Sequence, residues 1–147
     1  MTIEIAHMET KDFSRHEIIV GLTEQHTEKV ADNAIVLWEQ MATQIIAIVG
    51  EGGFNSLYAR SLFLIVSHHP WLASGALSPQ TGQRFSELNK CLEGQTPAQA
   101  VAGTTLLLIT FTDILASLIG EQLTIRILQS AWGPGTQGSI GKEFNNG

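Results

Sequence analysis

Apolar residues in the first half of the chain recur with helical spacing. Ala34, Trp38, Met41, Ile45 and Ile48 follow one another at intervals of three or four residues, which places them on one face of a helix. Residues 13–49 contain no proline and only one glycine, Gly21. This segment therefore predicts either one long helix or two helices joined near residues 21–27.

Glycine and proline mark the next boundaries. Gly50, Gly52 and Gly53 follow the periodic run and predict its end, because glycine takes a left-handed backbone conformation at little cost. A second apolar helix then begins at Phe54. Pro70 predicts its end, because a proline disfavours helical geometry in the residue before it.

Capping patterns predict two more helices. Ser78 and Pro79 resemble a helix start, and Gly94 marks the corresponding end. The segment Thr96-Pro97-Ala98-Gln99 is a stronger signal, with an N-cap threonine, a first-turn proline and a glutamine three residues after the cap. The helix that it opens is expected to bend at Gly120 and to end at residues 133–135.

These elements predict an all-α fold. No alternating run typical of a strand occurs after residue 12. We expect an N-terminal arm (1–12), a single-domain helical bundle of four to six helices (13–132) and a mobile, Gly-rich C-terminal tail (133–147).

Charge and cysteine content narrow the classes of function. The chain has 147 residues and a net charge of −6, and it has no cluster of Lys or Arg. Binding to nucleic acids or to anionic membrane surfaces needs such clusters, so we expect neither. The only cysteine, Cys91, excludes an internal disulfide, and the N-terminal residues lack the pattern of a signal peptide. We therefore expect a cytoplasmic protein.

The low share of charged residues points to self-association. Charged residues make up 15% of the chain, against about 25% in a typical soluble domain. The apolar faces of residues 34–49 and 98–131 are wider than one small bundle easily covers, and large exposed apolar patches usually mark interfaces. We therefore expect a homodimer, with a further protein partner as an additional option.

One segment is long enough to span a bilayer. Residues Ala98 to Gly120 carry a single charge, Asp113. A carboxylate near the centre of a lipid-embedded helix costs about 2.5–3.5 kcal/mol on insertion scales, and several threonines lower the hydropathy further. The favoured prediction is a buried central helix, and a membrane-inserted helix is the alternative.

Five charged residues are the candidate site. Asp113, Glu121 and Arg126 are the only charges between residues 96 and 132, and Glu51 and Arg60 lie upstream. A charge in an apolar helix is costly unless it is paired or hydrogen-bonded. The favoured interpretation is a set of partly exposed ion pairs of little energetic value. The alternative is one polar network of these five residues that is structural or binds a ligand.

Arg60 is the residue for which this hypothesis is sharpest. It is the only base between Lys29 and Arg84, and it lies in a mostly apolar helix. If Arg60 is buried it must meet a carboxylate, and we then expect it to pair with Asp113, Glu121 or Glu51.

Motifs of catalysis and metal binding are absent from the sequence. His68 and His69 are adjacent and point about 100° apart on a helix, and no HxxxH or HExxH spacing occurs. The glycines at 50–53 lack the lysine of a phosphate loop, and no GxSxG motif is present. We expect no catalytic residue, metal or cofactor.

Three functions remain open at this point. The favoured one is a non-enzymatic helical regulatory or adaptor module that acts through protein association. The second is a helical small-molecule sensor with a polar pocket near Glu51, Arg60 and Asp113. The third is a small enzyme that uses two carboxylates, since Asp113 and Glu121 lie about two helical turns apart.

Overall fold

Helices make up nearly all of the backbone in this computed structural model, which describes residues 15–24, 29–79 and 82–146 and the side chains up to Gly133. The predicted all-α bundle is confirmed, and no strand occurs in the described residues. The predicted arm 1–12 lies outside them. The elements are a helical segment at 15–24, α2 (Val30–Ile65), the 3-10 helix η2 (Pro70–Ser74), α3 (Ser86–Glu93), α4 (Pro97–Ile119) and α5 (Glu121–Asn146).

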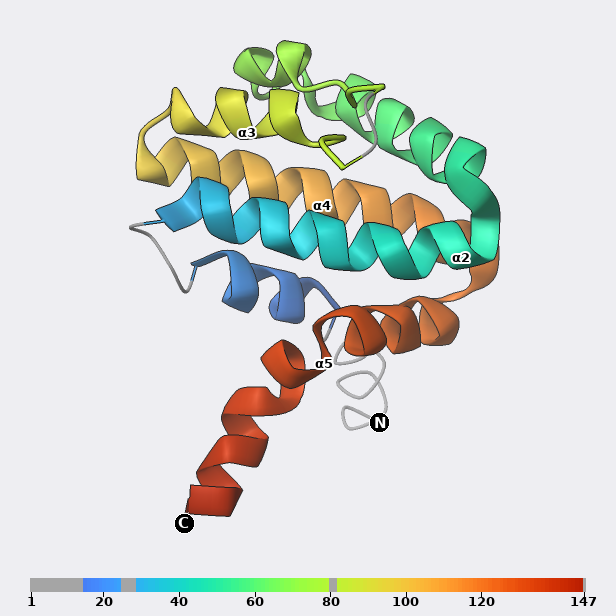
Figure 1. Cartoon of the computed structure of the whole chain (residues 1–147), viewed down its shortest axis with the longest axis vertical. Helices are drawn as coiled ribbons and strands as arrows, with labels where there is room; N and C mark the ends of the chain where they lie inside the picture. Colours follow the sequence, from blue (N-terminus) through green and yellow to red (C-terminus); the bar gives the residue numbers. More distant parts are fainter. Residues whose placement is uncertain (1–14, 25–28, 80–81, 147) are drawn as a thin grey trace, which may run out of the picture.

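Helix α4 occupies the middle of the bundle (Figure 1). It packs against α2 and α5, and α2 also packs against α3 and η2. In the view of Figure 1, α3, η2 and the second part of α2 lie above α4, whereas segment 15–24 and the start of α5 lie below it. Segments distant in the sequence are thus brought to the two sides of one central helix.

Helix α2 bends sharply at Gly50. This residue has φ +81° and ψ 167°, so the helical run stops there and resumes in a new direction. Only glycine adopts this conformation without strain. Gly120, with φ +100°, separates α4 from α5 in the same way, and both bends lie at the same end of the bundle. The predicted breaks at both glycines are confirmed.

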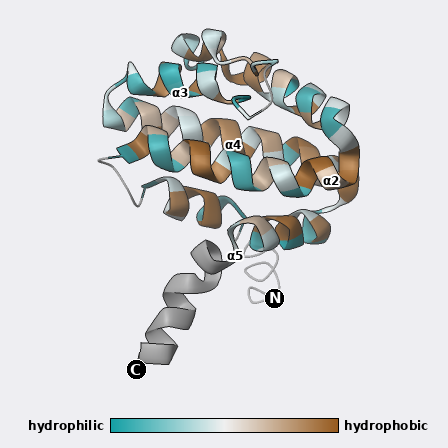
Figure 2. Ribbon diagram, viewed as in Figure 1, coloured by the Kyte–Doolittle hydropathy of each residue, from teal (hydrophilic) through white to brown (hydrophobic). Residues whose placement is uncertain are grey.

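Aromatic side chains fill the core between the two parts of α2 and α4. Trp38 is fully buried, and its ring centroid lies 5.2 Å from Tyr58, 5.3 Å from Phe111 and 5.7 Å from Phe85. Figure 2 shows hydrophobic residues recurring along α2 and α4 and hydrophilic ones on the outer helix α3. Because Trp38 contacts rings from three separate stretches of chain, it holds the bend of α2 against α4.

The cap of α4 is as predicted. Thr96 is the N-cap residue, and its hydroxyl accepts a hydrogen bond of 3.2 Å from the Gln99 amide. Pro97 occupies the first helical position. This local signal needs no tertiary contact, which explains why the sequence alone reveals it.

The predicted helix start at Ser78 is wrong. Helix α3 begins at Ser86, and residues 75–79 are not helical. The Ser78 amide donates instead to the Arg84 carbonyl at 2.9 Å, which closes a loop, and Gly82 has φ +85°. A loop held in this way leaves the Ser78–Pro79 pair without a helix to cap. The predicted end of α3 at Gly94 is confirmed.

The backbone of α5 continues to Asn146, past the predicted end at residues 133–135. Glycine costs about 1 kcal/mol and proline about 3 kcal/mol in a helix interior, which disfavours a helix without forbidding it. The side chains of 134–146 lie outside the described residues. The mobility of the tail 133–147 stays a prediction.

By length and composition alone, helix α4 could cross a membrane, and the core helix of a soluble protein often meets the same two criteria. In this structure its side chains Leu107, Leu108, Phe111 and Leu115 are fully buried against neighbouring helices. It is therefore a central helix of the bundle, with 39% of its most apolar stretch buried, and whether it lies in a membrane stays a prediction.

Candidate functional site

The five charged residues predicted from the sequence do not form one cluster. Asp113 on α4 and Glu121 at the start of α5 are brought together by an arginine from the N-terminal segment. Their spacing along one helix is not the reason, because Gly120 breaks the helix between them. Glu51 lies elsewhere and pairs with Arg84. The predicted single network is therefore two separate ion-pair groups.

Arg15 is the centre of the first group. Its Nε and Nη2 donate to the two carboxylate oxygens of Glu121 at 2.6 and 3.1 Å, and its Nη1 donates to Asp113 at 2.6 Å. Nη1 also donates to the Thr112 hydroxyl at 3.0 Å. His16 adds a contact of 3.0 Å between its Nε2 and the same oxygen of Asp113. The guanidinium side chain is only 7% exposed, whereas Asp113 is 48% exposed.

The position of Arg15 follows from the helical pattern of segment 15–24. Arg15, Ile19 and Leu22 lie four and three residues apart, so they share one face, and all three are buried. A guanidinium on the buried face needs carboxylate partners, and the helices that meet it supply them. Our sequence analysis missed Arg15. The spacing of Arg15 from Ile19 and Leu22 was the feature of the sequence that indicated its burial.

This group is suited to holding helices together. Burial opposes the charge of Arg15, but hydrogen bonds and attraction from Glu121 and Asp113 outweigh that effect and raise its pKa. Arg15 therefore stays charged and joins segment 15–24 to the end of α4 and the start of α5. Both carboxylates are engaged by the same guanidinium, so this geometry favours an ion-pair clamp over acid and base catalysis.

Arg60 and Arg126 do not take part in either group. Both are exposed and make no ion pair with any residue that the structure describes. The buried positions of the second part of α2 include Leu57, Tyr58 and Ser61, which leaves Arg60 on the outer side of the helix. The expectation that Arg60 pairs with Asp113, Glu121 or Glu51 is wrong, because its helical phase directs it to solvent.

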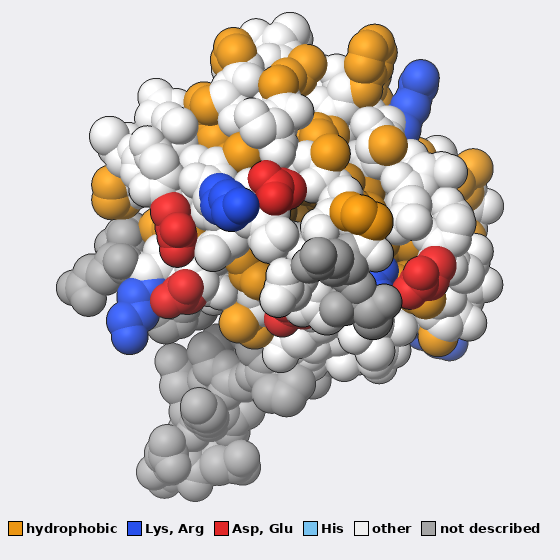
Figure 3. Space-filling model, turned by 45° about the horizontal axis from the view of Figure 1, so that its top comes forward, with side chains coloured by type: hydrophobic (Ala, Val, Ile, Leu, Met, Phe, Trp, Pro, Cys, Tyr) orange, Lys and Arg blue, Asp and Glu red, His pale blue; other side chains and the backbone are white. Residues whose placement is uncertain are grey.

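A cavity of about 660 Å³ lies between the second part of α2 and the chain at residues 73–79 and 84. We call it the α2 groove. Its lining residues are Glu51, Asn55, Tyr58, Ala59, Leu62, Phe63, Val66, Ala73, Ala76, Leu77, Ser78, Pro79 and Arg84. Most are apolar, and Phe63 is 73% exposed. Figure 3, which brings the top of Figure 1 forward, shows hydrophobic side chains spread over this face with few charges between them.

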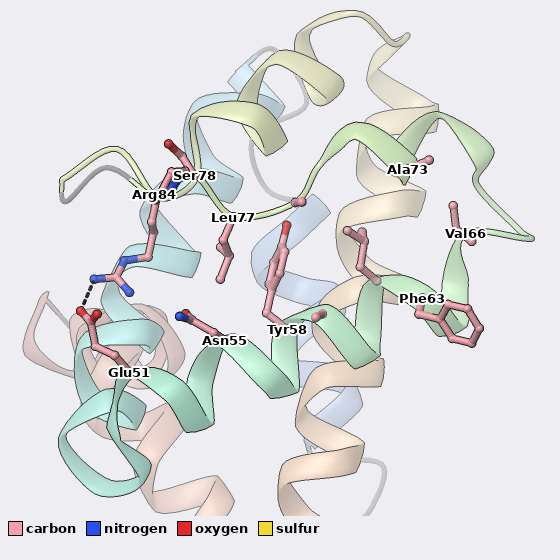
Figure 4. A pocket seen from close by; sticks show the side chains of 13 residues that line it. Glu51, Asn55, Tyr58, Phe63, Val66, Ala73, Leu77, Ser78 and Arg84 are labelled. Atoms are coloured by element: carbon pink, nitrogen blue, oxygen red, sulfur yellow. Dashed lines mark hydrogen bonds and ion pairs between the residues drawn. The ribbon is translucent and has the colours of Figure 1, made fainter.

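The α2 groove has a polar end and an apolar end (Figure 4). Glu51, Asn55 and Arg84 gather at one end, where Arg84 Nη2 donates to a Glu51 carboxylate oxygen at 3.2 Å. Phe63 and Val66 lie at the other end. Of the residues predicted for a polar pocket, Glu51 lines the groove, and Arg60 and Asp113 do not.

Tyr58 stands between the two ends and fixes the width of the α2 groove. Its hydroxyl donates to the Gly75 carbonyl at 2.7 Å, which ties α2 to the end of η2. Burial raises the pKa of the Tyr58 hydroxyl far above its usual value, and the nearby Cys91 adds to this effect. The hydroxyl is therefore neutral and already engaged, so Tyr58 serves as a wall of the groove.

The described residues offer no centre for metal or thiol chemistry. No group of three or more His, Cys, Asp or Glu in the described part of the chain is placed to hold a metal ion. Burial raises the pKa of the Cys91 thiol and Glu87 adds to this, against the opposing effect of a hydrogen bond with Ser74. A raised pKa keeps the sulfur in its less reactive thiol form.

Comparison with known proteins identifies no relative: no protein-family model, no curated protein and no solved structure matches the chain.

Proposed function

We propose that this protein is a non-enzymatic binding module that holds a small, largely apolar molecule in the α2 groove. The observation that carries the proposal is the cavity itself. Its volume of about 660 Å³ is within the ~300–1,000 Å³ that is usual for small-molecule sites, and it combines apolar walls with a few polar groups at one end.

The walls of the groove are suited to an apolar ligand. Leu62 and Phe63 come from α2 and Val66 from the turn that follows it, and Ala73 and Leu77 line the groove from the next segment. A ligand lying between these walls would cover Phe63, which is otherwise 73% exposed. Burial of apolar surface stabilises by roughly 25 cal/mol per Å², so such cover is favourable for both partners.

The binding test uses a neutral dye, N-phenyl-1-naphthylamine, which fluoresces more strongly in apolar surroundings. We expect saturable binding to the protein and its loss in Ala59→Trp, because Ala59 lines the groove and an indole there would fill it. The control is Ala102→Trp, which adds the same side chain at an exposed site on α4 that does not line the groove. Equal binding by both variants would contradict the proposal.

A second candidate function is association between two copies of the chain, and a particular set of exposed side chains favours it. Ile48 precedes the bend at Gly50, and Leu118 and Leu123 flank Gly120; they are 52%, 68% and 42% exposed. Because both bends lie at the same end of the bundle, this end carries an excess of aliphatic surface.

Light scattering tests this association. A homodimer has twice the 16.0 kDa mass of the chain, and we expect Leu118→Glu to shift it to the monomer. The matched control is Leu64→Glu, at an exposed leucine on the second part of α2, away from both bends. A wild-type monomer at high protein concentration would exclude this candidate.

A further inference from the structure

The ends of the α2 groove differ in chemistry, and this difference identifies a class of ligand. We infer that the groove binds a free long-chain carboxylate, with its head at Arg84 and its alkyl chain directed toward Phe63 and Val66. This inference rests on the proposed function, because it names the ligand of the same groove.

Arg84 has hydrogen-bonding capacity to spare. A guanidinium carries five N–H donors, and within the described residues the side chain of Arg84 makes one hydrogen bond, of 3.2 Å, to Glu51. Its side chain is 24% exposed, so its position is well defined while its donors still reach the cavity. A carboxylate can accept two parallel hydrogen bonds from such a fork, which the single contact with Glu51 does not provide.

Glu51 is easily displaced from this position. Its side chain is 66% exposed, against 24% for Arg84, and an ion pair to so accessible a carboxylate is worth about 0–1 kcal/mol. The Glu51 carboxylate can therefore turn into solvent when another carboxylate binds Arg84. The exchange replaces one anion beside Arg84 with another, so the arginine stays paired throughout.

Asn55 adds a neutral donor at the same end. Its side chain lies beside Glu51 and Arg84 in Figure 4 and has no hydrogen-bond partner among the residues that the structure describes. An amide N–H can donate to the second oxygen of a bound carboxylate. An alkylamine, in contrast, would depend on Glu51, whose exposure leaves its charge well screened by water.

The rest of the groove sets the requirement for an alkyl chain. Between Arg84 and the apolar end the ligand passes Tyr58 and Leu77. Neither side chain offers it a hydrogen bond, because leucine has no polar group and the Tyr58 hydroxyl is bound to the Gly75 carbonyl. Each methylene that becomes buried should tighten binding about fourfold until the groove is filled.

The experiment compares three ligands of equal chain length: dodecanoate, dodecanol and dodecylamine. Each displaces N-phenyl-1-naphthylamine from the protein at concentrations below those at which micelles form. We expect dodecanoate to bind at least tenfold more tightly than the alcohol or the amine. Arg84→Gln should remove this preference without changing the affinity for dodecanol, and Glu51→Gln should leave dodecanoate binding equal or tighter.

The outcomes separate this inference from the proposed function. Dye binding to Arg84→Gln shows that the groove is intact, so a lost preference reflects the missing charge and not misfolding. If the dye binds but dodecanoate has no advantage over dodecanol, or if Glu51→Gln weakens dodecanoate as much as Arg84→Gln does, the ligand class is wrong while the groove stays a binding site. If the dye does not bind, the proposed function itself fails.

Discussion

Arg15 holds Glu121 in a two-point contact, with hydrogen bonds of 2.6 and 3.1 Å between residues that are 106 positions apart in the chain. The contact closes the bundle by joining its first described segment to the start of its last helix. It also shows how a buried positive charge is retained, since Asp113 supplies a second carboxylate on the opposite side of the guanidinium. The stability of the fold should therefore depend on this one arginine more than on any exposed one.

We expect Arg15→Met to lower the free energy of unfolding by about 1–3 kcal/mol, because it removes several hydrogen bonds to charged groups. The cost is moderated because Glu121 and Asp113, at 25% and 48% exposure, can be hydrated again once the arginine is gone. Urea denaturation measures the change. The matched control is Arg60→Ala, an exposed arginine whose loss should stay within about 0.5 kcal/mol.

The partners of Arg15 should contribute unequally. Glu121→Gln should destabilise more than Asp113→Asn, because Glu121 makes two of the hydrogen bonds and is the less exposed. Combined with Arg15→Met, Glu121→Gln should be strongly non-additive, whereas combined with Arg60→Ala it should be additive. Equal effects of the two arginine substitutions would show that the Arg15 contacts carry little energy.

The features that the sequence predicted correctly are local ones. The cap at Thr96, the break at Gly50 and the bend at Gly120 each depend on a few adjacent residues and on backbone conformations that glycine favours. The predicted helix start at Ser78 is wrong because Ser78 and Pro79 cap a helix only if the residues after them are helical. The hydrogen bond from the Ser78 amide to the Arg84 carbonyl instead closes a loop.

The candidate site was harder to predict because it depends on contacts between distant segments. Helical spacing does not explain why Asp113 and Glu121 meet, because Gly120 breaks the helix between them, and no local pattern indicates that Arg15 lies between the two carboxylates. The exposed position of Arg60 follows from its place in the helix, because Leu57, Tyr58 and Ser61 form the buried face and residue 60 lies outside it. The α2 groove arises from the loop that replaces the predicted helix start, so a correct prediction of the loop was needed first.

Gly50 and Gly52 form a matched pair for testing the bend of α2. Gly50→Ala should destabilise by about 1–3 kcal/mol, because φ +81° and ψ 167° are strained for any residue with a Cβ atom. Gly52→Ala should instead stabilise by about 0.5–1 kcal/mol, because Gly52 is exposed within a helix and an added Cβ meets nothing within 4 Å. Thermal unfolding of both variants distinguishes them. A stabilising Gly50→Ala would mean that the bend is not required.

Gly103 allows Trp71 to lie directly against α4. A Cβ atom at position 103 would come within 2.6 Å of two ring carbons of Trp71, so the indole must move if alanine is introduced. Overpacking of this kind costs about 1–3 kcal/mol, and it is partly offset by the better helix propensity of alanine. We expect Gly103→Ala to destabilise by about 1–2 kcal/mol in urea denaturation. Adding Trp71→Phe to that variant should restore part of the loss, and the same substitution in the wild type should not stabilise.

Tyr58 should make the fold sensitive to alkaline pH. Burial raises its pKa in the folded protein, whereas an unfolded tyrosine titrates near pH 10. Above about pH 10 the unfolded chain therefore loses a proton that the folded chain retains, so stability falls as pH rises, by up to about 1.4 kcal/mol per pH unit from this group. Below that pH the contribution of Tyr58 to stability is complete.

The chain contains a single tyrosine, so the ultraviolet absorbance of tyrosinate reports on Tyr58 alone. We expect this signal to appear only together with the loss of helical circular dichroism, and to appear near pH 10 once urea has unfolded the protein. Tyr58→Phe is the control: it should lower stability at neutral pH by about 1–3 kcal/mol, because the buried Gly75 carbonyl loses its donor, yet reduce the slope of stability against pH above pH 10. Free ionisation of Tyr58 in the intact fold would show that the hydroxyl is accessible to solvent and that the wall of the α2 groove opens at this point.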